Sequence, residues 1–360
     1  MSFYIGLMSG TSADGMDAVV VDFSKPHPEL IAAHSCPYSD TERSKLRDAA
    51  LADSLPLDLI MQLDRDIAAR SVEAIQQVLQ SAGLPPEAIV ATGSHGHTLR
   101  HRSAPAGYSW QIGDPSWIAE HSGITCVADF RRRDIAADGE GAPLLPAFHH
   151  AVLSSQQPRM VLNLGGIGNL TILKAHSSLG FDTGPGNALM DDYCQQYLDQ
   201  RCDLDGNLAC QGKVNNSLLG HWLRNPYFRQ PIPKSTGREH FNLKNFTPDR
   251  SLSHQDNLAT LTELTAASVG LAVEQHDHAS GELLVCGGGV HNAYLMQRLQ
   301  SRLPGHILGN TGDFGIHPDW MEAMGFAWLA YQTLQRRPGN LPAVTGARGE
   351  RILGGIFLAS

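Results

Sequence analysis

The stretch FYIGLMSGTSADGMDAVVVDF, residues 3–23, decides the fold. An apolar run at residues 3–7 leads into a polar turn around Gly10, and a second apolar run follows at residues 18–23. Two such runs joined by a glycine-containing turn predict a β-hairpin.

A second stretch, MVLNLGGIGNLTIL, repeats this pattern at residues 160–173. The two copies begin roughly 155 residues apart, which is about the length of one domain. The repeat therefore predicts an internal duplication in which each copy opens its own domain. A chain of 360 residues also exceeds the size that one core usually supports, and a cleft between two domains favours a small-ligand site.

The rest of the chain alternates between strand and helix patterns, which predicts an α/β protein. Strands are expected at residues 88–92, 124–128 and 283–286, and helices at 57–79, 188–198, 258–274 and 292–303. The strand at 88–92 is expected to carry residues 93–98 at its end. We expect domains at 1–130 and 131–360, with residues 331–360 either continuing the second domain or packing back on the first. Residues 226–246 are expected to form a loop or lid.

Composition narrows the possible partners and location. The net charge is −9, and Arg131, Arg132 and Arg133 form the one basic cluster, too short to follow a nucleic-acid backbone. The six cysteines are scattered without a CxxC pair and are expected to be reduced thiols. With neither an export signal nor about 18 consecutive apolar residues, we expect a cytoplasmic protein with no nucleic-acid or membrane partner.

The first turn contains the groups that phosphate binding requires. Glycine lets backbone N–H groups approach an anion, hydroxyls donate hydrogen bonds, and carboxylates hold Mg²⁺. The alternative is an ordinary turn whose hydroxyls bond nearby backbone and whose carboxylates face water. The residues concerned are Gly10, Thr11, Ser12, Asp14, Gly15 and Asp17.

Two further glycine-rich segments are weaker candidates for nucleotide binding. The second turn carries Gly165, Gly166, Gly168 and Asn169, and is common in hairpins by itself. Gly287, Gly288 and Gly289 follow a strand, and form either a platform for the base or a crowded strand-to-helix turn. Because the chain has neither a P-loop nor a dinucleotide fingerprint, an ATP site has to be of another design.

Several of these segments, in this order, resemble the motifs of anhydro-N-acetylmuramic acid kinases. The similar segments are residues 10–17, 93–98, 127–131, 141–144, 163–169 and 181–187. The resemblance implies two actin-like (ribonuclease H-like) domains with a central interdomain cleft. It identifies the two turns as phosphate-binding loops and Gly287–Gly289 as the adenosine motif. It also implies ATP, Mg²⁺ held by Asp14 or Asp17, and a homodimer.

The implied reaction uses ATP and water. It converts 1,6-anhydro-N-acetylmuramic acid into N-acetylmuramic acid 6-phosphate, a step of cell-wall murein recycling. Asp182 matches the family's general base, which takes a proton from the water that attacks C1. On local sequence alone, a cap of the helix expected at residues 188–198 is a good alternative for Asp182, and both roles hold if the helix positions the carboxylate.

The resemblance also assigns sugar-binding residues, each with a simpler alternative. Arg131 would bind the lactyl carboxylate, or it is a surface arginine. Glu322 would contact the sugar, or it lies at a solvated helix start. The other candidates are His95, His97 and Thr98. Together with His101, the two histidines could instead begin a zinc site.

Three other functions stay open at this point. One is a conventional kinase for the hydroxyl of another sugar or of a polyol. Another is a non-catalytic binding module switched by nucleotide. The last is a metal-dependent hydrolase.

Overall fold

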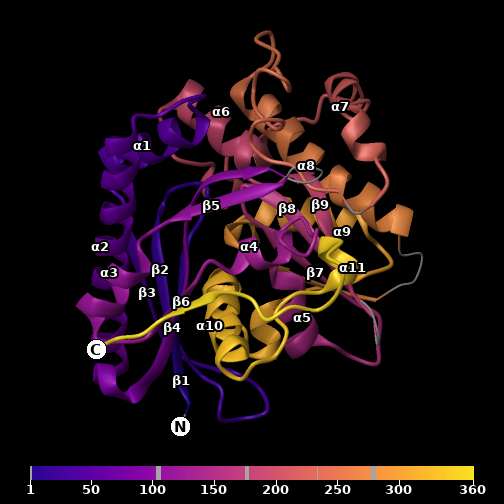
Figure 1. Ribbon diagram of the computed structural model, residues 1–360. Helices are drawn as coiled ribbons and strands as arrows, with labels where there is room; N and C mark the ends of the chain where they lie inside the picture. The colour runs from indigo at the N-terminus through magenta and orange to yellow at the C-terminus, as the bar shows by residue number, and fades with distance from the viewer. Residues whose placement is uncertain (1, 103–106, 175–177, 233, 277–280) are drawn as a thin grey trace. The chain divides into compact units, whose positions relative to one another are not determined.

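The computed structural model describes residues 2–102, 107–174, 178–232, 234–276 and 281–360 (Figure 1). Its contacts divide the chain into two compact units. The first comprises Met1–Val152 and Gly315–Ser360, and the second comprises Leu153–Phe314.

The first unit contains a mixed sheet with the strand order β12-β6-β4-β1-β2-β3. β1 pairs in parallel with β4, and β4 with β6, whereas β2 runs antiparallel between β1 and β3. A further strand, β5, extends β4 by antiparallel pairing. The strands are β1 (Phe3–Ser9), β2 (Gly15–Asp22), β3 (Glu29–Pro37), β4 (Ile89–Arg102), β5 (Tyr108–Ile112), β6 (Cys126–Ala128) and β12 (Gly355–Phe357).

The sheet of the second unit has the order β11-β10-β7-β8-β9. Here β7 is parallel to β10, and β10 to β11, whereas β8 is antiparallel to both β7 and β9. The strands are β7 (Arg159–Leu164), β8 (Ile167–Leu173), β9 (Leu179–Pro185), β10 (Glu282–Cys286) and β11 (Ile307–Asn310).

The two sheets share one topology, which confirms the predicted duplication. In each unit the third, second, first, fourth and fifth core strands lie in this order, and the second strand alone is antiparallel to the first. This is the order of the actin-like, ribonuclease H-like fold. Both predicted hairpins therefore open their units as expected.

Helices cover these sheets. The first unit contains α1 (Asp40–Leu51), α2 (Leu57–Ala82), α3 (Pro115–Ser122), α4 (Phe130–Ile135), α5 (Leu145–Leu153, which ends at the unit boundary), α10 (Met321–Leu334) and α11 (Pro342–Thr345). The second contains α6 (Ala188–Leu198), α7 (Asn216–Trp222), α8 (His254–His276) and α9 (Ala293–Arg302).

α2 and α10 lie on opposite faces of the first sheet. Ile5 and Leu7 of β1 join a core with Ile67 of α2, whereas Gly6, which points the other way in the strand, faces α10. A Cβ atom on Gly6 would lie 1.9 Å from the carbonyl oxygen of Ala323. Glycine therefore lets α10 approach the sheet directly, and Figure 1 shows α10 beside β4.

The carboxyl-terminal segment belongs to the first unit. The buried carboxylate of Asp134 in α4 accepts hydrogen bonds from Asn340 Nδ2 (2.7 Å) and Thr345 Oγ1 (2.8 Å). Together with the packing of α10, these contacts place residues 315–360 with residues 1–152. The division at residues 152 and 315 differs from the boundary expected at residue 130. The observed division depends on contacts between residues that are distant in the sequence.

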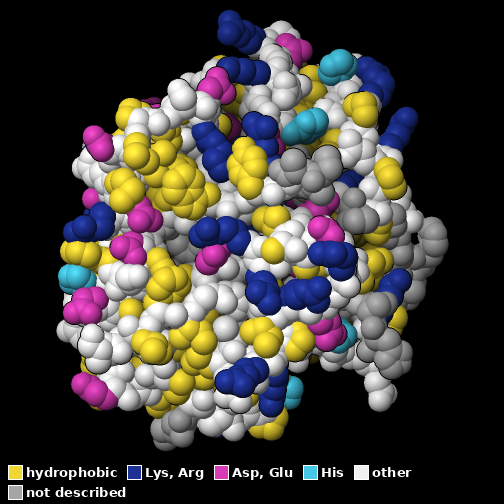
Figure 2. Space-filling model, in the orientation of Figure 1, with side chains coloured by type: hydrophobic (Ala, Val, Ile, Leu, Met, Phe, Trp, Pro, Cys, Tyr) yellow, Lys and Arg dark blue, Asp and Glu magenta, His cyan; other side chains and the backbone are white. Residues whose placement is uncertain are grey.

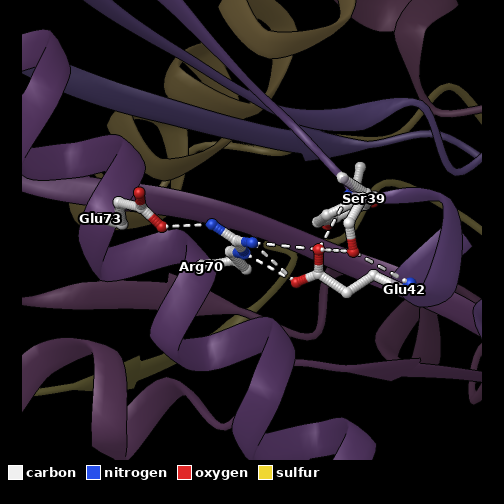
Figure 3. Close-up of polar contacts among 6 residues, drawn as sticks. Ser39, Glu42, Arg70 and Glu73 are labelled. Carbon is white, nitrogen blue, oxygen red and sulfur yellow. Dashed lines mark hydrogen bonds and ion pairs between the residues drawn. The ribbon is translucent and has the colours of Figure 1, made fainter.

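α1 is fixed at its start and tied to α2 (Figure 3). Ser39 caps the helix, since its hydroxyl accepts from the backbone N–H of Glu42 while the Glu42 carboxylate accepts from the N–H of Ser39. Arg70 of α2 donates from Nε to Glu42 Oε1 (2.9 Å) and from Nη1 to Glu73 Oε2 (2.6 Å). One capping carboxylate thus joins two helices.

Two local expectations were wrong. β4 does not end before Gly93 but continues to Arg102, because β5 provides an antiparallel partner. Asp182 lies inside β9, and Asn187 rather than Asp182 is the residue that precedes α6. Residues 226–246 lack strands and long helices in their described part, as expected of a loop.

Two properties of the surface and the helices bear on possible partners. Lys and Arg side chains lie in several small groups among acidic and hydrophobic side chains on the face that Figure 2 shows. No helix in the described ranges is long and apolar enough to cross a bilayer.

Candidate active site

The turn between β1 and β2 is tight. Ala13 adopts a positive φ of 54°, and its N–H donates to the carbonyl oxygen of Gly10 (2.9 Å). Thr11 is exposed and Ser12 half-buried. The hydroxyls of this turn are therefore accessible to a ligand.

The two carboxylates of this turn have different environments. Asp14 is exposed and forms an ion pair with Arg43 (2.8 Å). Burial raises the pKa of Asp17, and the nearby charges of Asp319 and Asp14 raise it further. A cation beside Asp17 would relieve this repulsion, which suits the residue to Mg²⁺ binding. Gly15 lies beside Pro37 at the start of the β2–β3 pairing.

His97 is part of a buried network below the turn. Its Nδ1 lies 2.9 Å from Ser9 Oγ, which also accepts a hydrogen bond from the Tyr38 hydroxyl (3.0 Å). Burial lowers the pKa of His97 to about 4, so the ring is neutral at physiological pH. These contacts link β1, β4 and the residue that follows β3, and place the His97 ring beneath the turn.

His95 and Arg131 form a second pair in the same unit. Arg131 Nη2 lies 2.9 Å from His95 Nε2, and the His95 Nδ1 lies 3.0 Å from the carbonyl oxygen of Gly96. A guanidinium can only donate, so Nε2 accepts and the proton is on Nδ1. Burial and Arg131 both hold the pKa of His95 well below its usual value.

Arg131 also reaches two other parts of the unit. Its Nη1 donates to the carbonyl oxygen of Gly141 (2.9 Å). Burial lowers the pKa of Arg131 to about 10, whereas the charge of Glu322 in α10 acts in the opposite direction. The structure thus brings His95, Arg131 and Glu322 together, as expected of residues that share one site. The surface-arginine alternative does not fit this half-buried position.

The remaining polar groups of β4 lie toward β5. Thr98 Oγ1 accepts from Gln111 Nε2 (3.1 Å), and His101 Nδ1 lies 3.1 Å from Ser109 Oγ. Within the described residues, no group of three or more His, Cys, Asp and Glu side chains is arranged to hold a metal ion. The contacts of the histidines are those of hydrogen-bonded side chains.

In the second unit, backbone hydrogen bonds fix the turn between β7 and β8. The carbonyl oxygens of Gly165 and Gly166 accept from the backbone N–H groups of Asn187 (2.8 Å) and Gly186 (3.0 Å). Arg238 lies over this turn, with its Nε 3.2 Å from the position that a Cβ atom of Gly166 would occupy. The Arg238 Nε atom is buried without a hydrogen-bond partner.

Asp182 is next to this turn in the sheet and is only 7% exposed. Its Oδ1 accepts from the Asn169 amide, and its Oδ2 accepts from the backbone N–H of Thr236 (2.8 Å). Both donors are neutral, and they favour the ionised carboxylate. β8 positions Asn169 because Asn169 pairs with Asp182 in the sheet register.

Gly287, Gly288 and Gly289 have different surroundings. A Cβ on Gly287 would lie 2.3 Å from Asn163 Oδ1, and one on Gly289 would lie 2.5 Å from the Leu164 Cβ. These two glycines therefore permit the close contact with the end of β7. Gly288 is exposed, with open space where a Cβ would be, so it alone offers a surface to a ligand.

Comparison with known proteins places the chain in a family. A family model described as anhydro-N-acetylmuramic acid kinase matches residues 2–359.

The chain belongs to the anhydro-N-acetylmuramic acid kinase family.

Members of this family from several bacteria cover almost the whole chain. The anhydro-N-acetylmuramic acid kinase of Xanthomonas campestris pv. campestris (strain 8004) is 49% identical over 99% of this chain and 97% of its own length. Those of Hahella chejuensis (strain KCTC 2396) and Shewanella sediminis (strain HAW-EB3) are 48% and 47% identical, covering 99% of this chain and 98% and 99% of their own lengths.

Among solved structures, component A of (R)-2-hydroxyglutaryl-CoA dehydratase from Acidaminococcus fermentans gives a TM-score of 0.48 at 11% identity. It covers 93% of this chain and 100% of that one. The fold assignment rests on the sheet topology of this chain and not on that similarity.

Sequence reasoning missed three features of this kinase family member. Tyr38 supports the first turn, Arg238 lies over the second, and residues 227–236 hold Asp182. Arg238 and Lys234 were visible as basic residues within the segment 226–246. Nothing in their local pattern indicated that Lys234 contacts Asp182 and that Arg238 contacts Gly166, because these partners are distant in the sequence.

Proposed function

We propose that this chain is an ATP-dependent kinase that opens 1,6-anhydro-N-acetylmuramic acid with water and phosphorylates O6. The products are N-acetylmuramic acid 6-phosphate and ADP. Family membership over residues 2–359 supports the activity. The observation that carries the mechanism is Asp182, a buried carboxylate that accepts hydrogen bonds from the neutral Asn169 amide and the Thr236 N–H.

Asp182 acts as the general base in this proposal. It takes a proton from water as the water oxygen bonds to C1. The C1–O6 bond breaks, and O6 forms a bond to the γ-phosphorus while the bond to the ADP oxygen breaks. An ionised carboxylate only accepts hydrogen bonds, so the donors from Asn169 and Thr236 orient Asp182 in the form that can take that proton.

The phosphate groups of ATP are bound by the two hairpin turns. Thr11 and Ser12 donate from the first turn, and Gly165, Gly166, Gly168 and Asn169 form the second. Arg238, whose guanidinium packs on Gly166 with an unused Nε donor, supplies positive charge to the phosphates. Gly288 lies against the adenosine, with Gly287 and Gly289 setting its position.

Asp17, assisted by Asp14, would hold Mg²⁺, which would neutralise charge on the phosphates during transfer. Proteins usually bind Mg²⁺ through one or two carboxylates together with substrate phosphates. The raised pKa of Asp17 beside Asp14 and Asp319 supports this assignment, because a bound cation would stabilise the ionised form.

The sugar is bound by residues of the first unit. Arg131 pairs with the lactyl carboxylate while His95 and Glu322 fix the guanidinium. Thr98 contributes its hydroxyl, and His97 supports the site indirectly through its contact with Ser9. We further propose a homodimer in the cytoplasm, where the six free cysteines would stay reduced.

Isotope labelling tests this function. Incubation of the full chain with Mg-ATP and the anhydro sugar in ¹⁸O water should release one ADP per sugar and place one ¹⁸O atom at C1. A conventional hydroxyl kinase would release ADP without label at C1. A nucleotide-switched binding module would give no sugar-dependent ADP at all, and either result would overturn the proposal.

A further inference from the structure

Three residues of one loop, Tyr227, Lys234 and Thr236, form hydrogen bonds with Asp182. The Tyr227 hydroxyl donates to the Asp182 carbonyl oxygen (2.8 Å), and the Asp182 N–H donates to the carbonyl oxygen of Lys234 (3.0 Å). The Thr236 N–H donates to the carboxylate itself (2.8 Å). One segment therefore holds both the backbone and the side chain of the proposed base.

The segment carries two cations, of which Arg229 is exposed and Lys234 is buried. Lys234 is only 8% exposed, which is unusual for a lysine. Its Nζ donates to the carbonyl oxygen of Tyr227 (3.1 Å) and lies 4.6 Å from the centre of the Tyr227 ring. These contacts fix the ammonium group next to the strand that carries Asp182.

The charges of Lys234 and Asp182 interact. Burial lowers the pKa of Lys234, whereas the charge of Asp182 raises it. Attraction between opposite charges is mutual, so the ammonium favours the ionised carboxylate. An ionised carboxylate that is buried requires such compensation, because the loss of hydration otherwise favours the neutral acid.

The Tyr227 phenol does not supply this charge. Burial raises the pKa of Tyr227, and the charge of Asp182 raises it further, so the phenol is neutral. His240 packs against the Tyr227 ring, with the ring centres 5.6 Å apart. Asn169, on the other side of the carboxylate, is uncharged.

We propose that Lys234 is a positioning residue that keeps Asp182 ionised, while Tyr227 and Thr236 fix the carboxylate in place. This inference rests on the proposed function, because it assigns a role to the segment through the general base. It gives residues 227–236 a catalytic purpose beyond covering the sheet.

The test is the pH dependence of kcat in Lys234→Met. The general base must be ionised, so kcat rises with pH through the pKa of Asp182. An opposite charge within about 4–6 Å typically lowers a carboxyl pKa by 1–3 units. The acid limb of the Lys234→Met profile should therefore move up by about one pH unit or more, and kcat should approach the wild-type value at alkaline pH.

Matched variants separate charge from packing. Lys244→Met removes an exposed lysine of the same loop and should leave the acid limb in place. Lys234→Arg retains the positive charge and should restore most of the wild-type limb. If Lys234→Met does not fold, as judged by thermal melting, Lys234→Gln serves for the same measurement.

Two outcomes would overturn the inference. One is an unshifted acid limb, and the other is an equal loss of kcat at every pH, which is the sign of a purely structural residue. Failure of the proposed function is distinguishable, because the wild-type chain would then give no ¹⁸O label at C1. Asp182→Asn with full wild-type activity would reject the base itself.

Discussion

A single buried carboxylate, that of Asp182, carries the proposed chemistry. Replacing it by Asn keeps the size of the side chain and removes the basic oxygen. General base catalysis is typically worth 10²–10⁴-fold in rate, so we expect kcat of Asp182→Asn to fall by about that factor. Sugar-dependent ADP release in the steady state measures this, with circular dichroism as the check on folding.

Asp199→Asn is the matched control. Asp199 is exposed and ends α6 in a left-handed conformation, which asparagine also adopts readily. We expect it to retain wild-type kcat. If Asp182→Asn lost less than about tenfold while Asp199→Asn stayed unchanged, Asp182 would be a structural anchor of residues 227–236 and not the base.

The residues assigned to the sugar show how far single positions can be understood from sequence. His95, Arg131 and Glu322 come from three distant segments, yet they lie together. Only the family motifs indicated this, because no local pattern links residue 95 with residue 322. For His97, sequence predicted a place in the sugar pocket but not its contact with Ser9, which follows from an irregularity in the β1–β4 pairing beside Gly96.

Among the elements, those with strong local signals were predictable. Both hairpins, α2, α6 and α8 agree with their sequence patterns to within a few residues. β9 was missed because its sequence, LGFDTGP, contains glycine and proline, which normally mark a turn. It forms a strand because β8 supplies hydrogen bonds along its length. Pairing between distant segments thus overrode local preference.

The burial of His97 in β4 makes the stability of the fold depend on pH. His97 is neutral in the folded chain, with a pKa of about 4, whereas an exposed histidine has a pKa near 6.5. As pH falls below about 6.5, the unfolded chain binds a proton that folded His97 does not. The stability contributed by neutral His97 is therefore complete above that value and is lost toward pH 4.

His97→Gln should flatten this loss. Glutamine does not titrate but can still bond Ser9. Below about pH 6 the free energy of unfolding should change less steeply with pH in the variant than in the wild type. The two slopes should differ by up to about 1.4 kcal/mol per pH unit. Hydrogen exchange of β1 and β4 amides in urea, between pH 4.5 and 7, measures it. Parallel curves for the two proteins would show that the His97 ring is already charged in the fold.

At the level of the whole molecule, the two duplicated units differ in how many segments of the chain form them. The second unit is one continuous segment, Leu153–Phe314, whereas the first needs both ends of the chain. Sequence could indicate the duplication, because each hairpin is local. Sequence could not assign residues 315–360, because the whole second unit lies between α10 and the strands of its sheet in the sequence.

A chain ending at Phe314 tests whether the first unit depends on the carboxyl-terminal segment while the second does not. It lacks α10, whose buried side chains include Met321, Met324, Phe326, Trp328 and Leu329. Burial of one large apolar side chain stabilises by about 1.5–3 kcal/mol, so their loss costs on the order of 10 kcal/mol, comparable with the whole stability of a domain. Amides of β1 and β4 should then exchange as in an unfolded chain, while those of β7 and β10 stay protected. Protection of β1 equal to that in the full chain would mean that the first sheet is stable without α10, and that Gly6 serves another purpose.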